Sequence, residues 1–128
     1  MQNPKVKMTS QNAKIEYEID AAGRTLGRVA SEAAKALMGK MRPDYTPNKR
    51  SNVRVKIVNA KKLYMRDRKK IQKIYKTYSG YPSGQRTESF QALSARRGAG
   101  EPLKRAVERM LPRNTFRTAR MRNLIISD

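Results

Sequence analysis

The chain has no cysteine and no histidine among its 128 residues, and it has only ten carboxylate side chains. Without these residue types there is no disulfide bond, no thiol nucleophile, no imidazole base and no zinc site of the usual kind. Catalysis would have to rest on a few carboxylates, lysines or tyrosines. We therefore expect no enzyme activity, no catalytic residue, no metal, no cofactor and no small-molecule substrate.

Long apolar segments are also missing. No apolar run approaches the roughly 20 residues of a transmembrane helix, and the first residues lack the apolar core of a signal peptide. Hydrophobic residues make up 38% of the chain, and the mean hydropathy is −0.86. We expect a modest hydrophobic core with extended polar segments, and no membrane partner.

Positive charge, in contrast, is abundant. Thirty lysines and arginines face ten acids, which gives a net charge of +20 and a pI near 10.9. Residues 41–128 carry a net charge of +17, and residues 1–40 carry only +3. Such charge on a small domain repels itself unless a polyanion supplies the counter-charge, and nucleic acid is the commonest polyanion. This distribution predicts a nucleic-acid-binding surface built mainly from the later part of the chain.

The hydrophobic pattern predicts one α/β domain over residues 15–128, preceded by a flexible basic and polar arm over residues 1–14. We expect three layers around a small, mostly parallel sheet of four strands. Alternating and helical periods give strands at 15–19, 53–58 and 123–127 and helices at 26–38 and 102–111. Thr25 and Gly39 are expected to cap the first helix, and a helical turn over 60–63 and a short helix near Phe90 are expected between these elements.

Two segments are harder to assign. Residues 69–78, "KKIQKIYKTY", fit both a helix and a strand, and their β-branched and aromatic content favours a strand, the fourth of the sheet. Residues 41–52 contain two prolines and follow neither period. They predict a long loop, and a loop of this length in a small domain favours a functional or partner-ordered role.

Residues 23–28, "GRTLGR", follow a strand and open a helix, as a phosphate-binding turn does. They lack the third glycine of a dinucleotide fingerprint and the Gly-Lys-Ser/Thr of a P-loop. We interpret them as a structural turn in which Gly23 makes the bend and Gly27 lets the helix pack closely on the sheet.

The glycine-rich stretch "YSGYPSGQR", residues 78–86, could hold a nucleotide or the backbone of a nucleic acid. A nucleotide site would need carboxylates for magnesium, and Glu88 is the nearest acid. We favour RNA, with Gly80 and Gly84 allowing close approach of the backbone, tyrosines stacking on bases and cations pairing with phosphates. The candidate contacts of this region are Lys73, Lys76, Tyr78, Tyr81 and Arg86.

Further candidates lie towards the C-terminus and in the long loop. No acid occurs between Arg109 and Ser127, whereas a solvated charged face normally mixes both signs. This cluster of positive charges without acids favours contact with a polyanion. The candidate RNA contacts are Arg96, Arg97, Arg105, Arg109, Arg113, Arg117, Arg120 and Arg122, together with the loop residues Lys49 and Arg50.

Five stretches occur in order that together resemble one known family: "DAAGRTLGRVASEAAKALMGK", "YTPN", "VNAKKL", "YSGYPSG" and "RMLPRN". From about Ile15 to Ile126 the chain is similar to the bacterial-type large-subunit ribosomal protein family numbered thirteen. The resemblance implies an α/β domain without enzyme activity that binds large-subunit ribosomal RNA and supports early subunit assembly. It also implies neighbouring ribosomal proteins as partners and a location in the cytoplasm, in the ribosome.

The chain departs from the family at identifiable positions. Asn48 stands where the family usually has histidine, and cations follow it where the family has an acidic run. Arg109 stands where the family often has glycine, which adds a candidate RNA contact.

The composition also bears on two functions other than the ribosomal one. A free RNA-binding translational repressor, acting on messenger RNA, shares every feature above and is the alternative. A DNA-packaging protein is disfavoured because no helix or ribbon that would enter a groove can be identified.

Overall fold

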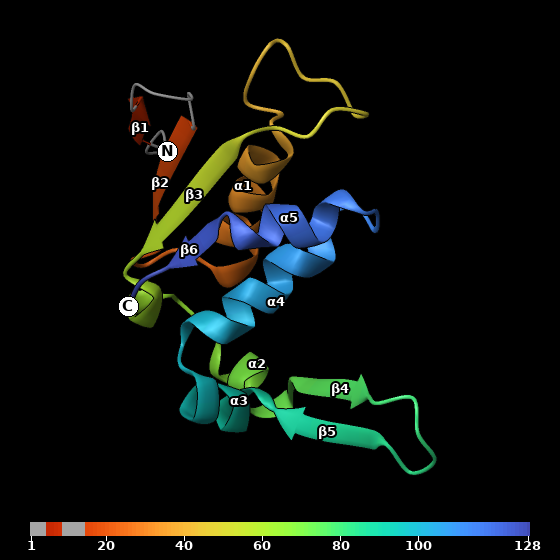
Figure 1. Cartoon of the computed structure of the whole chain (residues 1–128). Coiled ribbons are helices and arrows are strands. Elements are labelled where there is room, and N and C mark those ends of the chain that lie inside the picture. Colours follow the sequence, from red (N-terminus) through yellow and green to blue (C-terminus); the bar gives the residue numbers. More distant parts are fainter. Residues whose placement is uncertain (1–4, 9–14) are drawn as a thin grey trace.

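The computed structural model describes residues 5–8 and 15–128 (Figure 1). In chain order its elements are β1 (Lys5–Met8), β2 (Ile15–Asp20), α1 (Leu26–Met38), β3 (Val53–Val58), the 3-10 turn η1 (Ala60–Lys62), α2 (Asp67–Gln72), β4 (Ile74–Tyr78), β5 (Gln85–Ser89), α3 (Phe90–Arg97), α4 (Gly100–Met110), α5 (Phe116–Arg122) and β6 (Leu124–Ile126).

The first half of the domain follows the sequence pattern closely. Helix α1 begins and ends as its apolar spacing predicts, because its buried residues recur every three or four positions. Gly39 ends it with φ of +84°, and its N–H donates to the carbonyl of Ala36 at 2.9 Å. Thr25 is the N-cap residue, but its side chain makes no capping hydrogen bond.

The main sheet has the strand order β1-β2-β3-β6. Strand β3 pairs in parallel with β2 on one side and β6 on the other, so that Val55 lies between Tyr17 and Leu124. Strand β1 pairs antiparallel with β2. The mostly parallel sheet is thus confirmed. At Lys5–Met8 the structure differs from the predicted flexible arm, and the rest of that arm lies outside the described residues.

The hydrophobic core lies on one face of this sheet. The alternate residues of β2 and β3 are buried against α1 and α4, and Met121 of α5 packs against the same cluster. The opposite face carries Glu16, Glu18, Arg54 and Lys56, which are half-buried or exposed. The period-two alternation of β2 and β3 gives them one apolar face, and the predicted three-layer arrangement stays a prediction.

The segment 69–78 contains both of the structures that its sequence allowed. Its first part belongs to α2, and its last part is β4, which pairs antiparallel with β5 in a separate two-stranded sheet. The prediction of one long strand in the main sheet is wrong, and β5 was not predicted. In Figure 1 the β4–β5 hairpin lies beside α2 and α3 at the end of the molecule opposite the loop 41–52.

The turn before α1 is structural. Gly23 has φ of +67°, and its N–H donates to the carbonyl of Lys62 at 2.9 Å, which joins this turn to η1. The predicted role of Gly27 is wrong, because a Cβ atom at Gly27 would meet nothing within 4 Å.

Candidate nucleic-acid interface

The glycine-rich stretch is the connection of the β4–β5 hairpin. The N–H of Gly84 donates to the carbonyl of Tyr81 at 3.0 Å, and a Cβ atom at Gly84 would lie 2.1 Å from Oγ of Ser79. Gly80 has φ of +90°, in the region that favours glycine. The two glycines are therefore required by the turn itself. They leave the rings of Tyr78 and Tyr81 exposed, at 68% and 74%.

The two predicted cations of the hairpin lie on opposite faces. Lys76 pairs in register with Thr87, and Arg86 pairs with Thr77. Since neighbouring residues of a strand point to opposite faces, Lys76 shares a face with Tyr78, and Arg86 lies on the other side. Both side chains are exposed.

Tyr75 fixes the hairpin against α4. Its side chain is 5% exposed, and the guanidinium groups of Arg105 and Arg109 lie 5.0 and 5.8 Å from its ring centroid. Nζ of Lys73 is 5.6 Å from the same centroid. Burial raises the pKa of the Tyr75 hydroxyl, which the two arginines oppose, so the ring is a neutral platform for cations. Arg105 and Arg109, predicted as RNA contacts, thus have a partner inside the chain.

Two arginines of α3 are also engaged within the chain. Arg96 makes a bidentate pair with Glu88 of β5, both N–O distances being 2.9 Å. This hydrogen-bonded pair lowers the pKa of Glu88 and raises that of Arg96. Nη1 of Arg97 lies 3.3 Å from Oε1 of Glu101, which Arg105 also approaches at 3.7 Å. The acids of this region therefore offset part of the positive charge that was predicted to contact RNA.

The C-terminal arginines separate into different environments. Arg113 and Arg122 are exposed, and Arg117 is half-buried. Arg120 is only 3% exposed, its guanidinium lies 5.6 Å from the ring centroid of Phe116, and its Nε has no hydrogen-bond partner among the described residues. Arg120 is thus buried, unlike the other predicted contacts of α5, and its assignment to the RNA-contacting surface stays a prediction.

The loop 41–52 holds the two remaining candidates. Lys49 and Arg50 are exposed, and with neighbouring residues they line a hollow of about 190 Å³ at the C-terminal end of α1. Oγ of Ser51 donates to the carbonyl of Leu37 at 2.9 Å, which joins the end of the loop to α1. The loop and the hairpin lie at opposite ends of the molecule, so the predicted contacts do not form one patch (Figure 1).

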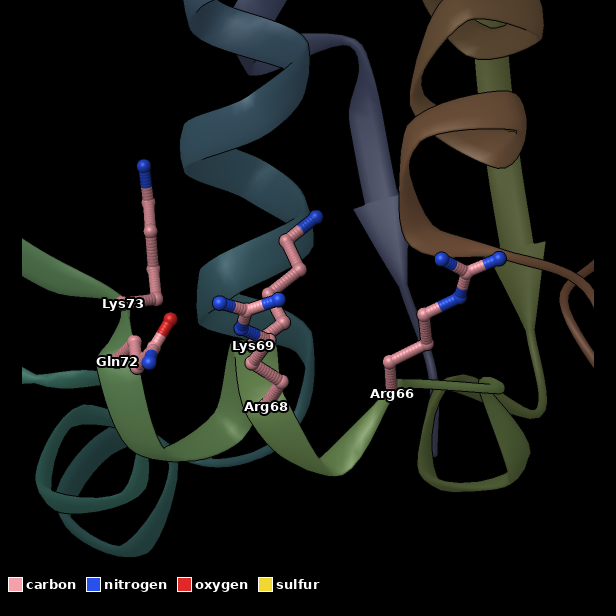
Figure 2. Close-up of a pocket in the computed structure, with 5 residues that line it drawn as sticks. All are labelled: Arg66, Arg68, Lys69, Gln72 and Lys73. Atoms are coloured by element: carbon pink, nitrogen blue, oxygen red, sulfur yellow. The ribbon is translucent and has the colours of Figure 1, made fainter.

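The structure also shows a cation-lined site that the sequence interpretation missed. A hollow of about 360 Å³ lies beside α2, and we name it the α2 hollow (Figure 2). Its lining residues are Arg66, Arg68, Lys69, Gln72 and Lys73. Only Lys73 was a candidate. The run "RDRKK", residues 66–70, is the signal that could have identified it, but the sequence interpretation assigned no role to residues 66–68 and treated Lys69 and Lys70 only as part of a helix or a strand.

The described part of the chain lacks two other kinds of feature. Within residues 5–8 and 15–128, no three acidic side chains gather closely enough to hold a metal ion. The same residues form no helix with the length and apolar character needed to cross a membrane.

A mixed α/β core with exposed tyrosines on a hairpin and cations around α2 and α5 defines a class: basic proteins that bind nucleic acid. Comparison with known proteins identifies the family. The family model described as ribosomal protein L13 matches residues 14–127, and the chain belongs to this family.

Curated relatives agree with this assignment. The chain is 44% identical over 108 residues to the large ribosomal subunit protein uL13 of Treponema pallidum (strain Nichols), which covers 84% of the chain and 75% of the relative. The protein of that name from Chlamydia pneumoniae is 39% identical over 118 residues, covering 92% of the chain and 78% of the relative. The protein of that name from Borrelia turicatae (strain 91E135) is 43% identical over 106 residues, covering 83% of the chain and 70% of the relative.

Proposed function

We propose that the chain is a structural constituent of the large ribosomal subunit in the cytoplasm, where it binds large-subunit ribosomal RNA and supports early subunit assembly. The observation that carries this proposal is membership of the ribosomal protein L13 family over residues 14–127. The net charge of +20 supports it independently, because RNA supplies the counter-charge that the chain lacks.

The mechanism is electrostatic and geometric. Residues 15–128 act as one RNA-binding domain whose core holds cations in fixed positions, and the arm over residues 1–14 precedes it, with its strand β1 paired to β2. Each phosphate that is neutralised releases counterions, which lowers the cost of bringing RNA helices together. The proposed direct contacts are Lys49, Arg50, Lys73, Lys76, Tyr78, Tyr81, Arg86, Arg113, Arg117 and Arg122.

The arginines of α3 and α4 have a different role in this proposal. Their primary role is to hold the hairpin and its neighbouring helices in place, and their remaining N–H groups contact RNA. These arginines are Arg96, Arg97, Arg105 and Arg109. Neighbouring proteins of the large subunit are the other partners. The charged second face of the main sheet, with Glu16 and Arg54 paired at 3.1 Å, is available to them.

Sedimentation tests the cellular part of this proposal. Most of the protein should sediment with large subunits in a fractionated cell extract. A protein found mainly in light messenger fractions would contradict it and would support the translational repressor.

Salt dependence tests the contacts. If about eight phosphates are neutralised, the logarithm of the binding constant should fall with a slope of about −6 to −7 against the logarithm of salt concentration. Arg86→Ala and Arg113→Ala should each weaken binding to large-subunit ribosomal RNA and flatten this slope by about one unit. The matched control is Arg120→Ala, which removes a buried arginine and should leave the slope unchanged. Equal slopes in wild type and in both surface variants would exclude these two contacts.

A further inference from the structure

The α2 hollow is the cation-rich site that the proposed contacts leave mostly unexplained. Four of its five lining residues are cations, and they come from eight consecutive positions. The acid within this stretch, Asp67, pairs with Lys70 at 3.0 Å, and Lys70 is outside the lining. Among the residues that the structure describes, no carboxylate lies within ion-pair distance of Arg66, Arg68 or Lys69. The positive charge of the hollow is therefore not offset by the chain.

Figure 2 shows how these side chains are arranged. Those of Arg68 and Lys69 on α2 and of Lys73 directly after it extend in the same general direction, alongside α4, and Arg66 stands apart at the other end of the group. Gln72 adds an amide that can donate hydrogen bonds. Like charges that share a hollow repel each other unless an anion lies among them. The site is thus a cluster of cationic donors with no carboxylate among its lining residues.

We propose that the α2 hollow binds consecutive phosphates of an RNA backbone. This inference rests on the proposed function, and it assigns the phosphate contact to residues that the other observations leave unassigned. Lysine and arginine are the side chains that bind phosphates, and an uncharged amide beside them adds a donor without opposing charge.

The neighbouring hairpin identifies the occupant as RNA and not a free anion. Strand β4 begins directly after Lys73, and it leads to the exposed rings of Tyr78 and Tyr81. A single-stranded RNA site has two parts: cations that bind the backbone and aromatic rings on which bases stack. The arginines of α3 and α4 are already paired with Glu88, Glu101 or Tyr75, so the α2 hollow carries more of the salt-dependent affinity than they do.

The first test is a double variant, Arg68→Ala with Lys69→Ala. Both side chains are exposed and alanine favours helices, so α2 is retained. Binding of the full chain to an in vitro transcript of large-subunit ribosomal RNA should weaken about tenfold near 0.1 M salt, and the salt slope should flatten by about 1.5 units. The matched control is Lys35→Ala with Lys61→Ala, which removes two exposed lysines elsewhere and should leave the slope unchanged.

The outcomes separate the two proposals. If the wild-type chain does not bind the transcript, the proposed function fails. If the wild type binds it and both double variants give the same slope, the α2 hollow has no special role and this inference is overturned, while the proposed function stands.

The second test uses the absence of cysteine. Gln72→Cys introduces a single thiol into the hollow without removing a cation, and an iron chelate attached to it cleaves RNA nearby. In large subunits assembled with this variant, cleavage at discrete positions of the ribosomal RNA is expected, at sites different from those produced by Gln91→Cys on α3. If subunits assembled with Gln72→Cys show no RNA cleavage from position 72, then no RNA lies beside the hollow, and the inference is overturned.

Discussion

At the scale of single residues, Arg120 is the least expected feature of the molecule. Burying a guanidinium is costly unless carboxylates or carbonyls surround it, yet within the described part of the chain its Nε has no hydrogen-bond partner. The ring of Phe116 gives a cation–π contact, which replaces only part of the lost hydration. We therefore expect the charge of Arg120 to reduce the stability of the free protein.

Arg120→Met tests this conclusion. Methionine fills similar space without a charge, so we expect unfolding free energy to be unchanged or raised by about 1–2 kcal/mol. Denaturant unfolding of the free protein measures it, with Arg122→Met, at an exposed position, as the control. If Arg120→Met lowers the unfolding free energy by more than about 1 kcal/mol, the guanidinium of Arg120 makes good interactions in the wild-type protein.

At the scale of elements, the hairpin depends on contacts with the helices beside it. A two-stranded sheet is marginally stable alone, and here Tyr75 packs beneath two arginines of α4 while Glu88 pairs with Arg96 of α3. These contacts set the direction in which Tyr78 and Tyr81 are presented. Arginines predicted as RNA contacts thus act first as positioning residues for the hairpin.

The Glu88–Arg96 pair predicts a pH dependence. Because the pKa of Glu88 is lowered in the folded state, the pair stabilises the protein above the ordinary value of 4.5, and this stabilisation is lost as pH falls through the folded-state value. Glu88→Gln should therefore lower Tm at pH 7, and the difference from wild type should disappear in acid. Thermal unfolding from pH 7 to pH 3 measures this.

The control for that pH series is Glu108→Gln, which changes an exposed acid of α4. Its Tm should follow that of the wild type throughout. A Glu88→Gln variant whose Tm deficit is the same at pH 3 and pH 7 would show that the ion pair is not the cause.

At the scale of the whole molecule, charge dominates. Thirty cations and ten acids share one small protein, and its exposed ion pairs contribute little individually. Repulsion among the remaining cations therefore opposes folding when no polyanion is present. RNA binding relieves this repulsion, which links stability to assembly.

Salt should stabilise the free protein for the same reason. Raising the salt concentration from about 0.05 to 0.5 M shortens the range of charge repulsion to a few ångströms, and Tm should rise by several degrees. Calorimetry of the RNA-free chain in sodium chloride measures this effect. A Tm that falls with salt would show that attractive pairs outweigh the repulsion.

Local pattern was sufficient for much of the fold. Period-two alternation predicts β2 and β3, and the apolar spacing with Gly39 predicts the bounds of α1, because these features depend on near neighbours in the sequence. The same pattern could not divide residues 69–78 between α2 and β4. That division depends on β5, whose residues lack a hydrophobic period of their own.

The sequence by itself determined the charge, the absence of cysteine and histidine, and a mostly parallel α/β core, since each is a property of composition or short-range spacing. Only the tertiary structure decided what each cation does. It buries Arg120, pairs Arg96 with Glu88, places Arg105 over Tyr75 and leaves the α2 hollow without an acid. Whether a cation is neutralised depends on residues that lie far away along the chain, and folding alone brings them together.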